Sequence, residues 1–487
     1  MTYPNFRAFV DDLERRGELT RVSRPVDPVL EITEIADRCV KRGGPALLFE
    51  RPVGSDIPVA INTYASWKRM GLALGAESMD EIAERIRKLV HLPQALPRMT
   101  LGEKLSAGWE ALGLLPKLKP RLVKSGRCQE IVETERPNLL ELPVLWCWPE
   151  DGGRFITLPL VFTKDRKTGA RNVGMYRLQV FDERTTGMHW HFHKESSRRY
   201  QDYEASGERM QVAVALGGDP TLTYCATAPL PDGIDEMMLA GFLRGAPVEM
   251  VQCKTVDLQV PASAEIVLEG YVEPGERRRE GPFGDHTGFY SLADDYPVFH
   301  LTAITRAADA IYPCTVVGKP PMEDTYLGGA TERIFLPLIQ MVMPEIRDMA
   351  MPLAGVFHNC VVVSIDKRYP LHARKICYAI WGTGQLMFSK FVIVVDHHVD
   401  VHNEQEVMWH VWNSVDPRRD TFVVDGPLDA LDHTCPRPCW GSKMGIDATR
   451  KWASEGFERE WPNEIDMSAD IKARVDGFWS ELGIDLP

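Results

Sequence analysis

The spacing of apolar residues divides the chain into three stretches of different character. In the first hundred residues, apolar positions recur at helical spacing over 6–13, 32–40 and 82–90, and a Ser-Met-Asp-Glu capping box at 78–81 precedes the last of these. A short apolar run at 46–49 indicates a strand. The pattern predicts a small α/β unit, followed from His91 to about Arg121 by a proline-rich connection toward the next domain.

The stretch from about 128 to 318 is mostly of β character. Runs of β-branched and aromatic residues, bounded by Gly, Pro and Asp, predict strands over 156–162, 173–181, 187–193, 211–216, 221–226, 265–272 and 298–304. So many short strands in this length favour a barrel or a sandwich.

Helices and apolar strands alternate again after Ala330. Helices are predicted over 330–343, 371–386 and 405–415, and strands over 360–365, 391–396 and 421–424. Uninterrupted apolar strands between helices are typical of a buried, mostly parallel sheet. The expected fold class is therefore a mixed α+β and α/β multidomain protein with a β-rich middle.

Composition and charge narrow the function classes. The chain has 487 residues, 44% of them hydrophobic, and a net charge of -13 with acidic and basic residues intermixed, which predicts a globular protein that does not bind nucleic acid. Its ten cysteines are scattered, with Cys435 and Cys439 the only close pair, as expected of a reduced, cytoplasmic protein. No leader is visible and the longest apolar runs are too short to cross a bilayer, so we expect at most peripheral membrane contact.

A histidine-rich segment is the first candidate for chemistry. In a strand, His189, His191 and His193 would share one face, because side chains alternate between the two faces. That face can bind a metal or a phosphate; the alternatives are a polar face of an edge strand or a spurious zinc cluster. A turn over 182–187 would fold this segment back, antiparallel, against the strand that carries Asn172 and Arg177.

The donors near these histidines favour a hard divalent ion. An amide oxygen, an imidazole and a carboxylate such as Glu236 would make a mixed oxygen and nitrogen shell, which suits manganese or magnesium better than structural zinc. Positive charge for a phosphate group is available from Lys194, Arg198 and Arg199.

Two carboxylates flank a tight loop. Glu280 and Asp285 are separated by Gly-Pro-Phe-Gly, so both would project from one place. Two neighbouring carboxylates cannot both ionise cheaply unless a cation lies between them, and Arg177 is the candidate cation. The alternative is an exposed glycine-proline turn with solvated acids.

Several long motifs give the chain a family resemblance. Among them are Glu280-Gly-Pro-Phe-Gly-Asp-His-Thr-Gly288 and matching segments over 30–36, 43–50, 260–271, 390–394 and 441–449. Over essentially its full length the chain resembles the UbiD family of reversible decarboxylases, which use prenylated FMN with a divalent metal and a potassium ion.

The resemblance implies a fold and site roles. It implies an N-terminal α/β domain with its connection (1–120), a split β-barrel that binds prenylated FMN (121–325) and a C-terminal α/β oligomerisation domain (326–487). It implies metal ligands at Asn172, His193 and Glu236, with Mn²⁺ or Mg²⁺ bound, and a catalytic triad of Glu280, Arg177 and Asp285. The implied cofactor contacts are Asn172, Met175, Tyr176, Arg177, His189, Trp190, His191, His193, Lys194 and Lys390.

The resemblance also implies a substrate class and partners. The expected substrate is an aromatic carboxylic acid, with 3-polyprenyl-4-hydroxybenzoate of ubiquinone biosynthesis first and a menaquinone-pathway dihydroxynaphthoate or another aryl acid second. Three histidines in one segment and the sequence over 318–324 depart from the ubiquinone branch, whereas Asp285 resembles it. A flavin prenyltransferase would supply the cofactor, and the chain would form a homodimer or homohexamer. The alternatives from other classes are a metal-dependent hydrolase and a non-catalytic flavin-binding subunit.

Overall fold

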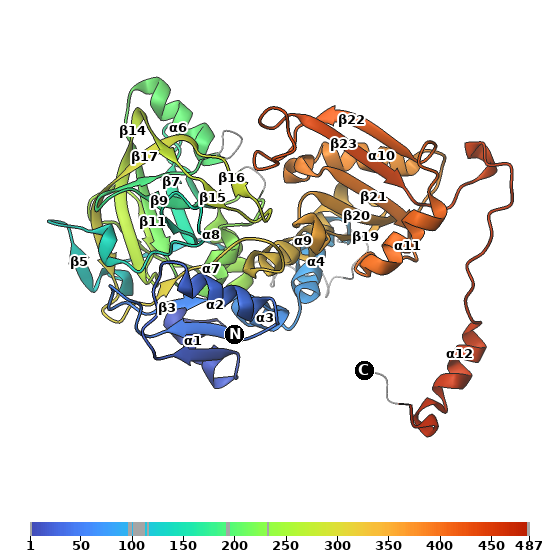
Figure 1. The fold of residues 1–487 in the computed structure, drawn as a ribbon, viewed down its shortest axis with the longest axis horizontal. Coiled ribbons are helices and arrows are strands. Elements are labelled where there is room, and N and C mark those ends of the chain that lie inside the picture. Colours follow the sequence, from blue (N-terminus) through green and yellow to red (C-terminus); the bar gives the residue numbers. More distant parts are fainter. Residues whose placement is uncertain are drawn as a thin grey trace.

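The computed structural model describes residues 2–95, 100, 113, 116–190, 195–230 and 233–484, and has three parts (Figure 1). The N-terminal part contains four helices and three strands: α1 (Phe6–Arg15), β1 (Leu19–Val22), α2 (Glu31–Val40), β2 (Ala46–Phe49), β3 (Val59–Ile61), α3 (Trp67–Leu74) and α4 (Met79–Ala95). The strands form a four-stranded sheet in the order β1-β2-β3-β18, so β18 (Tyr312–Pro313) joins it from a distant part of the chain.

The predicted N-terminal elements are confirmed. The helical pattern at 6–13 lies in α1, whose apolar side chains are buried, and the strand predicted at 46–49 is β2, with all four residues buried. At the start of α4 the hydroxyl of Ser78 accepts the amide of Glu81 at 3.3 Å. The Glu81 carboxylate accepts the amide of Glu77 at 3.0 Å, one residue earlier than in a capping box.

The middle part is built on a nine-stranded antiparallel sheet in the order β6-β9-β10-β17-β14-β11-β7-β8, with β5 paired to β17. Its strands are β5 (Ile131–Glu133), β6 (Arg154–Ile156), β7 (Pro159–Lys164), β8 (Arg171–Met175), β9 (Leu178–Val180), β10 (Thr185–Gly187), β11 (Met210–Leu216), β14 (Ile266–Glu280) and β17 (Asp294–Arg306). Around it lie β4 (Arg121–Val123), β12 (Glu249–Gln252), β13 (Gln259–Pro261), β15 (Phe283–Gly284), β16 (Tyr290–Ser291), α6 (Glu195–Ser206), α7 (Pro220–Cys225) and α8 (Glu236–Arg244).

Two short links force this sheet to curl into a half-barrel. Strands β8 and β9 lie near opposite ends of the sheet, yet only Tyr176 and Arg177 separate them. In a flat sheet six strand spacings would place them about 29 Å apart, whereas a link of two residues reaches about 11 Å. The same holds for β6 and β7, which Thr157 and Leu158 join. The sheet therefore rolls up until its ends meet, and Arg177 lies at the junction.

Four predictions for the middle part are corrected. The strand predicted over 156–162 is divided by Thr157 and Leu158 into the end of β6 and the start of β7. The run over 221–226 is the helix α7, because the Asp219 side chain accepts the amide of Thr221 at 2.9 Å and Pro220 occupies the first turn. All six residues of α7 are buried, so no periodicity distinguished it from a strand. The strand predicted over 173–181 is broken by the link at Tyr176 and Arg177. The strand predicted over 187–193 ends at Gly187 as β10, and residues 191–193 lie outside the described residues.

The C-terminal part contains a five-stranded sheet in the order β19-β20-β21-β23-β22. Its elements are α9 (Glu323–Val342), β19 (Ile346–Ala350), β20 (Cys360–Ile365), α10 (His372–Trp381), β21 (Phe391–Asp396), α11 (Glu404–Ser414), β22 (Thr421–Gly426) and β23 (Gly441–Asp447). The centre of the sheet is parallel as predicted, but both edge strands run antiparallel to their neighbours, so the sheet is mixed.

The last described segment leaves this part and runs along the outside to α12 (Ala469–Asp476), which stands apart from the rest of the molecule (Figure 1). No residue of α12 is buried. Single 3₁₀ turns connect other elements: η2 (Arg127–Gln129), η3 (Leu139–Glu141), η4 (Leu353–Gly355), η5 (Gly384–Phe388), η6 (Ala453–Glu455) and η7 (Trp479–Leu482). The helix predicted over 371–386 is divided between α10 and η5.

The structure also bears on the expectations for cysteines and for membrane-spanning helices. All ten cysteines belong to the described residues and are free thiols, the close pair Cys435 and Cys439 included. Among the described helices, none combines the length and the apolar character needed to cross a bilayer.

The cap of α7 generates a stability prediction. The buried carboxylate of Asp219 accepts both the Thr221 amide and, at 2.7 Å, Nε of Arg244 at the end of α8. Asp219→Ala removes the cap and leaves the Arg244 guanidinium without this acceptor, so the free energy of unfolding should fall by about 2 to 4 kcal/mol. Denaturant unfolding followed by circular dichroism measures the change. Asp416→Ala, at an exposed turn, is the control and should lower the free energy of unfolding far less. Equal effects of the two substitutions would contradict the stabilising role of Asp219.

Candidate functional site

A cavity of about 790 Å³ lies where the half-barrel faces the C-terminal part. Strand β8 and the following link contribute Asn172, Met175, Tyr176 and Arg177 to its wall. The other described residues that matter for chemistry come from several elements: His189, Arg198, Arg199, Glu236, Phe283, Asp285, His286, Asp324, Phe357, Gln385 and Leu431. Both large parts of the chain therefore line one cavity.

The guanidinium of Arg177 is the centre of the polar groups in this wall. Its Nε donates to Oε1 of Glu280 at 3.1 Å and its Nη1 donates to Oδ2 of Asp285. Its Nη2 donates to Oγ of Ser291 at 3.0 Å, and the ring of Phe283 covers the guanidinium, with Cζ 4.4 Å from the ring centroid. The predicted contact of Arg177 with both carboxylates is confirmed.

The loop that carries the two carboxylates is held by the neighbouring strands. The peptide bond between Gly281 and Pro282 is cis, and Gly281 has a φ of 92°, in the region that favours glycine. The side chain of Gln179 accepts the Gly281 amide at 2.7 Å and donates to the Gly152 carbonyl at 2.7 Å. A second buried acid, Asp151, accepts the amide of Gly284 at 2.7 Å. These bonds fix where Glu280 and Asp285 point.

Charge balance keeps both acids of the site ionised. Burial alone would raise the pKa of Asp285, but Arg177 and His286 outweigh it and hold that pKa far below its usual range. Burial also opposes ionisation of Glu280, but Arg177 and the neighbouring imidazole of His189 lower its pKa. Burial and the Arg177 charge lower the pKa of His189, whose Nδ1 lies 2.8 Å from Oε2 of Glu280. At neutral pH the group formed by Arg177, Glu280, Asp285 and His189 therefore contains two carboxylates, one guanidinium and a neutral imidazole.

A pair of histidines continues the network from Asp285 to the C-terminal part. Nδ1 of His286 lies 2.8 Å from Oδ1 of Asp285, and Nε2 of His286 lies 2.7 Å from Nε2 of His358. Burial lowers the pKa of His286, but the hydrogen bond to Asp285 together with the negative charges of Asp285, Asp324 and Asp429 outweighs it, and the net shift is upward. The ring of Phe357 stacks on His286 at a centroid distance of 5.3 Å. His286 can therefore hold a proton next to Asp285.

Sequence reasoning did not single out these histidines. His286 stands inside the quoted motif, and its position next to Asp285 was a usable signal. His358 follows a turn far along the chain and gave none. Asp324, in the first turn of α9, was also missed as a site residue; burial raises its pKa to about 7.

The predicted metal ligands Asn172 and Glu236 line the same cavity. Glu236 is the first residue of α8, and its Oε2 accepts the amide of Val173, next to Asn172, at 3.0 Å. Burial raises the pKa of Glu236 to about 7, so a cation bound there would favour its ionised form. The Asn172 amide group donates to Oγ of Ser196 on α6 at 3.0 Å. An amide and a carboxylate in the wall of one cavity fit a hard divalent ion. His193 lies outside the described residues.

The other predicted cofactor contacts divide into three groups. Met175, Tyr176 and His189 line the cavity, and so do Arg198 and Arg199 of α6, which supply positive charge. Trp190 and Lys390 are not among the described residues that line it: Trp190 packs on Tyr200, and Nζ of Lys390 contacts Asp432 and Thr434. His191 and Lys194 lie outside the described residues. The roles of all these residues toward a cofactor stay predictions.

Comparison with known proteins identifies relatives along the whole chain. Three family models match: the N-terminal, Rift-related and C-terminal domains of 3-octaprenyl-4-hydroxybenzoate carboxy-lyase, at residues 10–88, 121–320 and 325–448. A protein of Archaeoglobus fulgidus, described as uncharacterized, is 50% identical over 487 residues, 99% of each chain.

Solved structures agree with these matches. The vanillic acid decarboxylase of Sedimentibacter hydroxybenzoicus in its closed form is 28% identical, with a TM-score of 0.87 over 99% of each chain. The UbiD-class enzyme HmfF of Pelotomaculum thermopropionicum in complex with FMN is also 28% identical, with a TM-score of 0.79 over 97% of this chain and 100% of that one. The sheet that curls into a half-barrel, the flanking α/β parts and the family matches lead to one conclusion: the chain belongs to the UbiD family of carboxy-lyases.

Proposed function

We propose that this chain catalyses the non-oxidative, reversible decarboxylation of a hydroxyaryl carboxylic acid with prenylated FMN as cofactor. The observation that carries the proposal is Arg177, held by Glu280 and Asp285 at the wall of a cavity. The same cavity collects Asn172 and Glu236 for a metal ion, with Arg198 and Arg199 for a phosphate group. A relative with a solved structure, HmfF, has been seen in complex with prenylated FMN.

The reaction needs an electron sink that side chains cannot provide. Loss of carbon dioxide from an sp² carbon leaves an unstabilised carbanion, and prenylated FMN, when bound, supplies the group that accepts this charge. We assign its phosphate to Arg198, Arg199 and the metal at Asn172, His193 and Glu236. Mn²⁺ or Mg²⁺ is the expected ion, accompanied by K⁺. The remaining predicted contacts are Met175, Tyr176, His189, Trp190, His191, Lys194 and Lys390.

The chain's own residues orient the substrate and exclude water. The planar guanidinium of Arg177 would bind the substrate carboxylate by two parallel hydrogen bonds, which a lysine ammonium cannot reproduce. Its bond to Glu280 keeps it in place, and the ring of Phe283 covers it from water. This positioning fixes the carboxylate relative to the cofactor before carbon dioxide leaves.

We propose that Asp285 returns the proton to the carbon that lost carbon dioxide. Asp285 is a carboxylate at rest, so it must first receive a proton. When the Nη groups of Arg177 donate to the substrate carboxylate while Nε stays bonded to Glu280, the hold of Arg177 on Asp285 would weaken and the pKa of Asp285 would rise. His286 Nδ1, 2.8 Å from Oδ1 of Asp285, is the donor within reach. The proton passes from His286 to Asp285 and then to the ring carbon.

The substrate class, partners and domain division form the finer part of the proposal. The first candidate substrate is 3-polyprenyl-4-hydroxybenzoate and the second is a dihydroxynaphthoate; similarity to a vanillic acid decarboxylase supports a phenolic acid. We further propose domains at 1–120, 121–325 and 326–487, a flavin prenyltransferase as cofactor supplier, a homodimer or homohexamer, and a cytoplasmic location.

Cofactor dependence is the first test of this proposal. The chain produced without a flavin prenyltransferase should release almost no carbon dioxide from a panel of hydroxyaryl acids, because FMN lacks the electron sink. Co-production with the prenyltransferase should restore release, and mass spectrometry should identify prenylated FMN in the active protein. Full decarboxylation by protein that contains only FMN would contradict the central claim.

Glu236→Gln tests the metal assignment. Replacing this carboxylate by a neutral amide removes the anionic ligand, so bound Mn²⁺ and bound cofactor should decrease together. Elemental analysis and flavin absorbance measure the two contents on the same sample. The matched control is Glu249→Gln at the exposed first residue of strand β12, which should retain both. Unchanged metal content in Glu236→Gln would indicate a different ligand set.

Asp285→Asn tests the proton transfer. The amide keeps the shape of the side chain but cannot transfer a proton, so turnover should fall about a hundredfold or more. Exchange of the product's ring hydrogen with deuterated water, followed by NMR, should fall with it. The control Asp294→Asn changes an exposed acid at the start of β17 and should exchange at the wild-type rate. Wild-type exchange in Asp285→Asn would assign the proton to Glu280 or water.

A further inference from the structure

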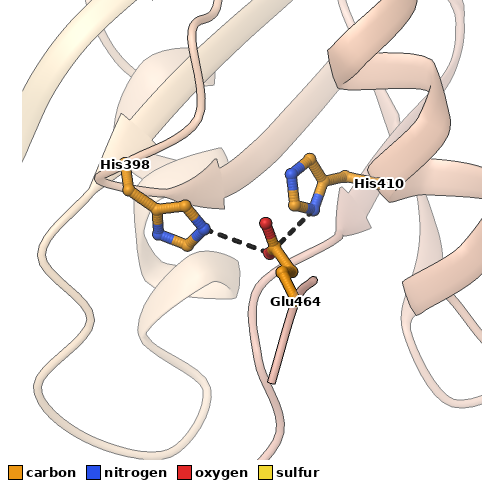
Figure 2. Close-up of side chains that lie close together, drawn as sticks. All are labelled: His398, His410 and Glu464. Carbon is orange, nitrogen blue, oxygen red and sulfur yellow. Dashed lines mark hydrogen bonds and ion pairs between the residues drawn. The ribbon is translucent and has the colours of Figure 1, made fainter. Parts of the chain in front are cut away.

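Two histidines and a glutamate meet on the C-terminal part, among residues that do not line the cavity (Figure 2). His398 follows strand β21, His410 lies on helix α11, and Glu464 belongs to the segment that runs on to α12. Their possible ligand atoms all lie within 4.8 Å of one another. Nε2 of His398 is 3.1 Å from Oε1 of Glu464, and Nδ1 of His410 is 3.9 Å from the same oxygen.

The longer of these two distances suits a shared ion better than a hydrogen bond. An ion with tetrahedral ligands at about 2.1 Å separates neighbouring donor atoms by about 3.4 Å. The two measured distances from Glu464 lie on either side of that value. A hydrogen bond accounts for His398, but 3.9 Å is too long for one to His410, whose buried ring nevertheless directs Nδ1 to the same carboxylate.

We propose that His398, His410 and Glu464 bind a divalent ion of the zinc type, with water in a fourth position. Two imidazoles and one carboxylate are a known ligand set for zinc. Imidazole selects zinc, copper or nickel over magnesium and manganese, so this site should differ in metal preference from Asn172 and Glu236. The site does not depend on the proposed decarboxylase activity.

The ion would fasten the C-terminal segment to the domain it leaves. Residues 457–468 form no helix or strand, and no residue of the following α12 is buried. Two hydrogen bonds from Arg450, to the Trp461 carbonyl at 3.0 Å and to Oδ1 of Asn463 at 3.4 Å, hold the segment just before Glu464. A metal link from Glu464 to a strand end and a helix would set the direction in which the segment departs.

Metal titration of the full chain tests the proposal. The parent protein carries Glu236→Gln, which weakens the predicted site in the cavity, and is stripped with a chelator. It should bind one equivalent of Zn²⁺ but no Mg²⁺. It should also bind one equivalent of Co²⁺, with the visible absorption that is typical of Co²⁺ at low coordination number. His398→Gln and Glu464→Gln, both at half-exposed side chains, should each weaken Zn²⁺ binding at least about tenfold.

His397→Gln is the matched control, because His397 is an exposed neighbour whose side chain is not in the cluster. It should bind Zn²⁺ like the parent protein. Zn²⁺ should also slow amide hydrogen exchange of the segment around Glu464 in the control, but not in His398→Gln. Absence of Zn²⁺ uptake by the parent protein would overturn the proposal. So would Zn²⁺ binding by His398→Gln and Glu464→Gln that is as tight as that of the parent protein.

Discussion

The position of Arg177 in the chain is the constraint on which the site depends. Arg177 occupies a two-residue link between strands near opposite ends of the nine-stranded sheet. The curl of the sheet brings these two strands together and so determines the position of Arg177. Its guanidinium then bonds to Glu280 at the end of β14 and to Asp285 in the following loop. The charged groups of the site thereby also tie the junction of the half-barrel to its longest strand, and folding and chemistry share one interaction.

Burial strengthens the interaction of Arg177 with Glu280 and Asp285, and it makes the charge of each group depend on the others. Side chains that are almost fully enclosed cannot stay charged alone, so the two acids remain ionised only while Arg177 and the histidines face them. Any ligand that draws Arg177 away changes the proton affinity of Asp285 at once. A substrate carboxylate would act in this way, because it competes for the same donors. In the proposed mechanism, Arg177 would thereby link substrate binding to proton supply.

How much the sequence could reveal follows from the physics of each element. Strands at 46–49, 360–365 and 391–396 were predicted with their observed bounds, because short buried apolar runs between helices leave few alternatives. The strand predicted at 221–226 was wrong because this segment is also a short buried run. A helix that is buried on all sides has no polar face that would distinguish it from a buried strand. Antiparallel edges of the C-terminal sheet depend on tertiary pairing, which periodicity does not encode. Arg177 and the two acids were predicted as charges that needed one another, whereas His358 reaches the site only through folding.

The geometry of the site depends on how the half-barrel and the C-terminal part are positioned relative to each other. Phe357 of the C-terminal part stacks on His286, and His358 is hydrogen-bonded to its Nε2, so the imidazole beside Asp285 is held across this boundary. Lys390 of the same part is paired with Asp432 and does not line the cavity, so a contact between Lys390 and a cofactor would require its side chain or this part to move. Closer approach of the two parts would narrow the cavity that both line and exclude water from Arg177. The half-barrel supplies Arg177 and its two acids, and the C-terminal part would control access of water to them if the two parts moved closer.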